Sequence, residues 1–191
     1  MKKAFFLIFL LSLISSAFAQ HDGHNLTLAK IAHEASHRIG RLVDTGRLED
    51  VFLKNMSSLE IKSLPHNQHT EPAFSVLASA GTTGSQTLLK FDMNGKYLSN
   101  TLIAQSDSEA SPWEVNSNEI IEAALHYAME ANPNLNLGSF TTELAKASLG
   151  QLALEDGSIK PTVTLSRNNS PKILQIILTP KGEVVSHSVI E

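Results

Sequence analysis

Two histidines and a glutamate in the stretch "KIAHEASHRIG" (30–40) form a pattern that can hold a zinc ion. His33, Glu34 and His37 match the H-E-x-x-H motif of zinc proteases. On a helix, histidines four residues apart lie on one face and can bind one Zn²⁺, while the glutamate acts as general base on the bound water. One interpretation of this chain is therefore a small secreted zinc metalloprotease with Glu34 as its catalytic residue.

Three features of the surrounding sequence favour a non-catalytic surface helix instead. The third ligand of the extended protease pattern would fall at Val43, which cannot bind a metal. The helix begins only a few residues into the predicted mature chain, which leaves no room for the strands that form a protease cleft. His33 and His37 also share a helical side with Lys30 and Arg41, whose positive charges oppose metal binding. We therefore expect no enzymatic activity.

A metal site without catalysis is a separate hypothesis. It rests on the clustering of histidines, since six of the eight lie between residues 21 and 69. Neutral imidazole is a common ligand of zinc, copper and nickel, so zinc or copper are the candidate metals. No spacing among these histidines fixes a four-ligand site by itself, and surface histidines without a metal are the simpler interpretation. The candidate ligands are His21, His24, His33, His37, His66 and His69.

The N-terminal stretch "MKKAFFLIFLLSLISSAFAQ" has the features of a secretory signal peptide. Two lysines precede an apolar stretch, and Ala17-Phe18-Ala19 supplies the small-residue cleavage signature. Residues 1–19 are thus predicted to be a signal peptide and 20–26 a histidine-containing tail. We expect an exported protein, periplasmic or secreted, with no membrane association after the signal peptide is cleaved.

The composition excludes several classes of function. The chain has no cysteine, which rules out disulfides, thiol catalysis and thiolate metal sites. It has 15 Lys and Arg, two of them in the predicted signal peptide, against 19 Asp and Glu. A net negative charge without a basic stripe disfavours nucleic acid and anionic membranes as partners, because both bind clustered Lys and Arg.

Hydrophobic periodicity predicts two amphipathic helices. The first covers about residues 28–45 with Thr27 as its N-cap, and the second follows a capping box of Asn116 and Glu119. An irregular middle is expected after the first helix, and "TTELAKASLGQL" (141–152) has a helical pattern. Runs rich in apolar residues predict strands at 73–80, 85–93, 160–168 and 172–190, and "NGKYLSNTLI" (94–103) continues the second of them after a tight turn at Asn94-Gly95.

The same order of elements is expected in two parts of the chain, each with a helix followed by paired strands. Gly95 in "DMNGKYL" and Gly182 in "TPKGEVV" occupy equivalent turns. The acidic, Ser-containing stretch 105–115 is the natural linker. We therefore predict an α+β fold, with a helix packed on an antiparallel β-hairpin or sheet, in two tandem units over residues 27–104 and 116–191. Whether these units arose by duplication stays open.

The stretches "LAKIAHEASHRIGRLVDTGRLEDVF" and "QTLLKFDMNGKYL" resemble PepSY-like exported domains of bacteria. The resemblance covers about residues 27–104 and, more weakly, 116–190. It implies a helix on an antiparallel sheet without catalytic residues, and a role in binding or regulation such as peptidase inhibition. The expected partner is a protein or peptide in the periplasm. Exposed edge strands could accept an extended peptide.

Overall fold

The computed structural model describes residues 26–65, 71–81, 84–105, 115–130, 135 and 137–191. Of these residues, 43% lie in strands and 28% in helices. The helices are α2 (Leu28–Asp44), α3 (Val51–Lys54), α4 (Ser117–Glu130) and α5 (Gly138–Thr142). The strands are β1 (Met56–Ser63), β2 (Phe74–Ala80), β3 (Ser85–Phe91), β4 (Tyr97–Ala104), β5 (Leu144–Ala153), β6 (Ile159–Arg167), β7 (Ile173–Leu178) and β8 (Val184–Ile190).

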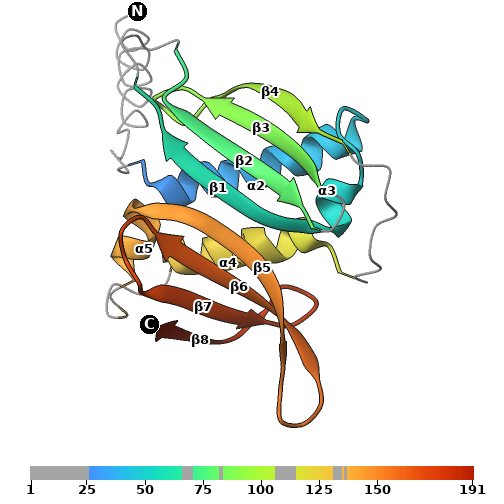
Figure 1. Ribbon diagram of the computed structural model, residues 1–191, viewed down its shortest axis with the longest axis vertical. Coiled ribbons are helices and arrows are strands. Elements are labelled where there is room, and N and C mark those ends of the chain that lie inside the picture. Colours follow the sequence, from blue (N-terminus) through green and yellow to red (C-terminus); the bar gives the residue numbers. More distant parts are fainter. Residues whose placement is uncertain (1–25, 66–70, 82–83, 106–114, 131–134, 136) are drawn as a thin grey trace, which may run out of the picture.

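All eight strands belong to one antiparallel sheet, in the order β4-β3-β2-β1-β5-β6-β7-β8 (Figure 1). The predicted α+β fold of helices packed on hairpins in tandem units is wrong, because this continuous sheet dominates the structure. The two parts of the chain are joined where β1 pairs with β5, over Ser58–Glu60 and Lys146–Ser148. Each of these strands would be an open sheet edge in a separate unit, and their pairing removes both edges.

The central strands β1 and β5 are also the two strands that the sequence patterns did not predict. β1 lies in the expected irregular middle, and β5 replaces most of the helix expected over 141–152. β5 contains the good helix formers Leu, Ala and Lys, and its buried Leu144 and Ala147 are three residues apart, as on a helix face. Pairing with β1 on one side and β6 on the other overrides this local preference.

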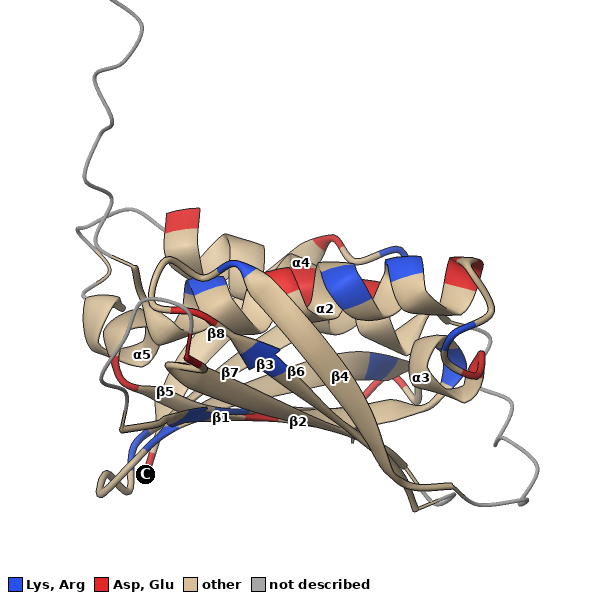
Figure 2. Ribbon diagram, turned by 90° about the horizontal axis from the view of Figure 1, so that it is seen from above, with Lys and Arg blue, Asp and Glu red and all other residues tan. Residues whose placement is uncertain are grey.

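The helices cover one face of the sheet (Figure 2). α2 begins at its predicted N-cap, where the Thr27 hydroxyl accepts a hydrogen bond from the Lys30 N–H at 3.2 Å. At the start of α4 the Asn116 side chain accepts one from the Glu119 N–H, also at 3.2 Å. Both predicted helix starts are therefore confirmed. The buried residues of α2 form a stripe at helical spacing, made of Ala29, Ile31, Ala32, Ala35, Ser36, Ile39 and Leu42.

One apolar core fills the space between the helices and the sheet. Its fully buried side chains include Phe52 on α3, Phe91 on β3 and Leu165 on β6, so both parts of the chain contribute to it. Because the core is shared, we expect the whole chain from α2 to β8 to unfold as one cooperative unit.

Two hairpin turns have the same backbone hydrogen bonds. In the β3–β4 turn, Gly95 has a φ of 76° and its N–H donates to the carbonyl of Asp92 at 3.0 Å. In the β7–β8 turn, Gly182 has a φ of 83° and its N–H donates to the carbonyl of Thr179 at 2.9 Å. The side chains of Asp92 and Thr179 each accept two further N–H bonds from the turn. Glycine is required at both places because other residues rarely adopt such a φ.

Candidate functional site

His33 and His37 lie on α2 where this helix packs beside α4. Nε2 of His33 is 3.7 Å, and Nδ1 of His37 3.9 Å, from the same oxygen, Oε1 of Glu122 on α4. The ring of His126, one turn further along α4, has its centre 5.9 Å from that of His33. The side chains of His33 and Glu122 are only 24% and 28% exposed. We call these four residues the α2–α4 cluster. The expected solvated face of α2 is thus partly a boundary between helices.

A buried polar bridge fixes how the two helices meet beside this cluster. The Ser36 hydroxyl donates to Oδ1 of Asn118 at 2.7 Å, and the Asn118 amide donates to the Ser36 carbonyl at 3.1 Å. Next to it, the Ser117 hydroxyl accepts from the Met56 N–H at 2.7 Å and donates to the Leu53 carbonyl at 2.6 Å. Buried polar groups need such partners, so the start of α4 has one favoured position against α2 and β1.

Glu34, the catalytic residue of the protease interpretation, lies about 100° around the helix from His33. It is exposed and lines a hollow on the β3–β4 side of α2, together with His37, Arg38, Arg41 and Lys96. A general base must be within hydrogen-bond reach of the water that it activates. This placement beside three cations gives no support to Glu34 as a catalytic base.

The remaining predicted ligands, His21, His24, His66 and His69, lie outside the described residues, as does most of the predicted linker 105–115. Within the part of the chain that the structure describes, no group of three or more His, Asp or Glu side chains lies close enough together, as placed, to hold a metal ion.

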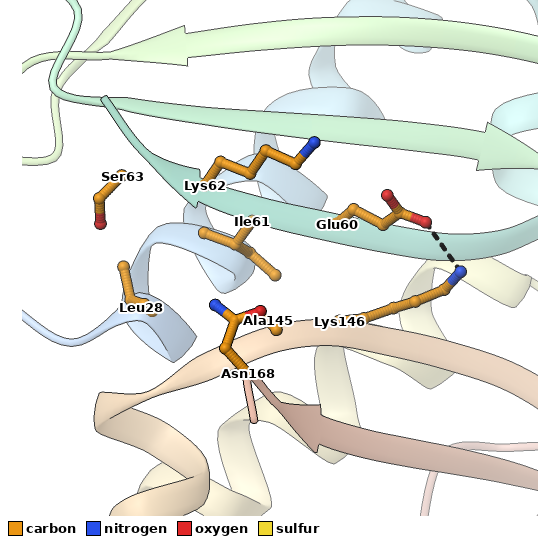
Figure 3. A pocket seen from close by; sticks show the side chains of 8 residues that line it. All are labelled: Leu28, Glu60, Ile61, Lys62, Ser63, Ala145, Lys146 and Asn168. Carbon is orange, nitrogen blue, oxygen red and sulfur yellow. Dashed lines mark hydrogen bonds and ion pairs between the residues drawn. The ribbon is translucent and has the colours of Figure 1, made fainter. Parts of the chain in front are cut away.

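A hollow of about 520 Å³ opens where β1 and β5 diverge (Figure 3). Matched residue pairs between these strands end at Glu60 and Lys146, and Ile61–Ser63 pair only with β2. Glu60 and Lys146 form an ion pair of 2.8 Å at one end of the hollow. The hollow therefore follows from the divergence of the strands. Glu60 and Lys146 neutralise each other, and Lys62 is the third charged side chain that lines it.

One carboxyl in a turn has a clearly shifted pKa. The Ser158 hydroxyl, 2.6 Å from Oδ1 of Asp156, lowers the pKa of that carboxyl, and the Ser158 N–H adds a second hydrogen bond at 2.8 Å. Asp156 lies in the exposed β5–β6 turn, so this shift reflects local turn geometry and marks no reactive site.

The two edge strands of the sheet carry no charge. β4 ("YLSNTLIA") and β8 ("VVSHSVI") contain no Lys, Arg, Asp, Glu or Pro. Proteins usually place charges or proline on edge strands, which blocks the addition of further strands. Here the charged residues of the sheet all lie on inner strands, as Glu60, Lys62, Lys90, Lys146, Lys160 and Arg167.

β8 is the more regular of the two edges. Ser186 to Ile190 pair with β7 without interruption after one register shift at the start of β8, whereas the pairing of β4 with β3 is irregular near both ends. Such irregularities twist an edge away from an incoming strand. Val185 and Val189 are each 48% exposed. The hydroxyl of Tyr127 on α4 lies 2.7 Å from Nδ1 of His187, which fixes the middle of β8 against the helix.

Comparison with known proteins finds distant structural similarity only. No protein-family model matches the chain, and no curated protein sequence matches it. A DUF2874 family protein from Bacteroides uniformis has 13% identity and a TM-score of 0.23, with 82% of this chain and 86% of that chain covered. A BLIP-like protein from Bacteroides fragilis has 15% identity and a TM-score of 0.23, covering 77% of this chain and 91% of that one.

A candidate periplasmic protein from Bacteroides eggerthii has 15% identity and a TM-score of 0.24, with coverage of 81% and 87%. Values this low assign neither a family nor a function to the chain, and the resemblance to PepSY-like domains stays a prediction. None of the helices in the described residues is long and apolar enough to cross a membrane.

Proposed function

We propose that this protein is a non-enzymatic exported binding protein that accepts an extended segment of a protein partner along β8. The observation that carries the proposal is the distribution of charge over the sheet. Six charged residues lie on inner strands, and the regular outer strand β8 has none. An uncharged, regular edge has unpaired backbone groups that can hydrogen-bond to another strand.

The chemistry of β8 favours an uncharged partner segment with alternating apolar side chains. Alternate residues of a strand point to opposite faces, so a partner strand would meet Val189 on one face and Ile190 on the other. Each backbone hydrogen bond adds only about 0.5–1.5 kcal/mol, while association costs at least about 4 kcal/mol. Apolar contacts must therefore supply much of the affinity, and we expect dissociation constants in roughly the micromolar range.

The test is a selection of random seven-residue peptides on the exported full chain, followed by anisotropy measurements with labelled synthetic copies of the selected peptides. We expect sequences rich in Val, Ile and Thr without charge. Val189→Lys should weaken their binding at least tenfold, because the new charge lies on the edge that accepts the strand. Leu102→Lys on the irregular edge β4 is the matched control, and it should leave the affinity unchanged.

Two results would contradict the proposal. One is a failure to select any peptide, and the other is binding that Val189→Lys leaves intact. The mass of the protein in solution tests a further outcome. A dimer that Val189→Lys dissociates would mean that a second copy of this chain occupies β8 in place of a foreign peptide.

A further inference from the structure

We infer that the α2–α4 cluster of His33, His37, Glu122 and His126 binds one transition-metal ion of the Zn²⁺ type. The cluster is separate from the β8 edge, and this inference does not depend on whether that edge binds a peptide. Each helix offers a pair of ligand residues four positions apart, His33 with His37 on α2 and Glu122 with His126 on α4. Residues at this spacing lie on one face of a helix, and here the two pairs face each other.

The distances in the cluster are close to those of a tetrahedral site. With metal–ligand bonds of about 2.0–2.1 Å, two ligand atoms lie about 3.3 Å apart and two ligating imidazole centres about 5 Å apart. The two histidine nitrogens lie 3.7 and 3.9 Å from the Glu122 oxygen, and the rings of His33 and His126 are 5.9 Å apart. All three distances are longer than in a formed site, so side-chain rotations must bring the four groups together when the ion binds.

Electrostatics and the neighbouring carboxylate favour a cation at this place. Glu122 supplies a negative charge, and in the described part of the chain its ion pairs are with His33 and His37, not with Lys or Arg. Arg38 and Arg41 line the hollow on the β3–β4 side of α2, and of the four proposed ligands only His37 lines that hollow too. Nε2 of His126 lies 3.1 Å from Oε2 of Glu130, which leaves Nδ1 free for the metal. A carboxylate on the second ring nitrogen is the usual support of a metal-binding histidine.

The ligand set suits zinc, copper or nickel, which imidazole nitrogens prefer, and is unsuited to calcium or magnesium. A bound ion would connect α2 to α4 beside the Ser36–Asn118 bridge. We therefore expect metal binding to raise the melting temperature of the protein, since the ion binds the folded chain only.

The experiment measures Zn²⁺ affinity of the exported full chain, purified without a histidine tag, by competition with a chromophoric chelator. Co²⁺ serves as a second probe, because four-coordinate Co²⁺ has intense visible absorption. We expect one ion per chain with a Co²⁺ spectrum of this kind. Glu122→Gln and His126→Ala should each weaken Zn²⁺ binding at least tenfold and abolish the metal-dependent rise in melting temperature.

Two matched controls separate this site from other ligands on the chain. Glu119→Gln removes an exposed carboxylate from the same helix, and His21→Ala/His24→Ala removes the histidines of the N-terminal tail. Both should leave the affinity within about twofold. His126 is exposed, so its replacement by alanine tests the site without disturbing the fold. Binding that survives Glu122→Gln and His126→Ala, or that disappears only in the tail variant, would overturn the inference.

Discussion

The two parts of the chain, residues 28–104 and 117–190, repeat the order long helix, short helix and four strands, but they fix their edge strands with different chemistry. In the first part, the guanidinium of Arg38 on α2 lies 4.3 Å from the ring centre of Tyr97 on β4. In the second, the hydroxyl of Tyr127 on α4 lies 2.7 Å from Nδ1 of His187 on β8. A cation–π contact in the first part and a hydrogen bond in the second thus each join the long helix to the edge strand. The comparison shows that the backbone arrangement does not require one particular side-chain contact there.

The largest losses of stability should come from replacing the buried phenylalanines of the two short helices. Phe52 on α3 is fully buried, while Phe140 on α5 is covered on one side by the Arg167 guanidinium, 4.7 Å away. Phe52→Ala should lower the free energy of unfolding by about 4 kcal/mol, and Phe140→Ala by about 3 kcal/mol because the Arg167 side chain can partly fill the space. Urea unfolding followed by circular dichroism measures both values. Two separate transitions in either variant would contradict a shared core.

The turn glycines should show the next largest effect. A Cβ at Gly95 would lie 3.0 Å from Leu26 Cδ1 and 3.2 Å from Ile31 Cδ1, whereas one at Gly182 would lie 3.4 Å from the Cβ of Ala123. Both substitutions by alanine force a positive φ, at a cost of about 1–2 kcal/mol. Gly95→Ala should cost up to about 1 kcal/mol more, since the side chains of Leu26, just before α2, and of Ile31 on α2 must also shift. Gly138→Ala, which meets no atom within 4 Å, is the control and should change stability little. An equal loss at both turns would show that the contact with α2 is unimportant.

Removing the contacts that hold the edge strands against the helices should lower stability by smaller amounts. Tyr127→Phe removes the hydrogen bond to His187 and should cost about 1 kcal/mol. Arg38→Gln removes the cation–π contact with Tyr97 and should cost about 0.5 kcal/mol. Amide exchange of β8 and β4 in the two variants measures the local effect. If Arg38→Gln loosened β8 as much as β4, the two contacts would not act on separate edges.

The ion pair between the two parts should have the smallest effect. Glu60 and Lys146 are 2.8 Å apart but their side chains are 36% and 42% exposed, so solvent screens them. A double-mutant cycle of Glu60→Gln and Lys146→Gln should give a coupling of about 0.5 kcal/mol or less, which falls further in high salt. A coupling several times larger would mean that charge, more than strand pairing, holds the parts together.

The elements that the sequence predicted are those whose local pattern agrees with their final position. The helices after Thr27 and Asn116 have capping residues and apolar stripes, and strands β2, β3, β6 and β7 have apolar side chains at suitable spacing. β1 and β5 were missed because their state depends on each other, and the composition of β5 favours a helix. The continuous sheet could not be predicted for the same reason.

Two of the four residues in the α2–α4 cluster, His33 and His37, were identified from the sequence, and Glu122 and His126 were not. The pattern His33-Glu34-x-x-His37 drew attention to α2, although its glutamate lies on another side of the helix from Glu122. Glu122 and His126 have the same four-residue spacing on α4, and this was the available signal. Connecting them to α2 required the antiparallel packing of the two helices, which the buried Ser36–Asn118 bridge fixes and no local pattern encodes.

The pairing of β1 with β5 also has a consequence for the order of events during synthesis. Residue 58 is made long before its partner, residue 148, and until then β1 has no neighbour on that side. Contacts so distant along the chain slow folding, and an unpaired strand is prone to aggregate meanwhile. We expect a chain truncated after residue 105 to remain unfolded or to aggregate. The risk of aggregation should therefore be highest between the translation of β1 and the translation of β5.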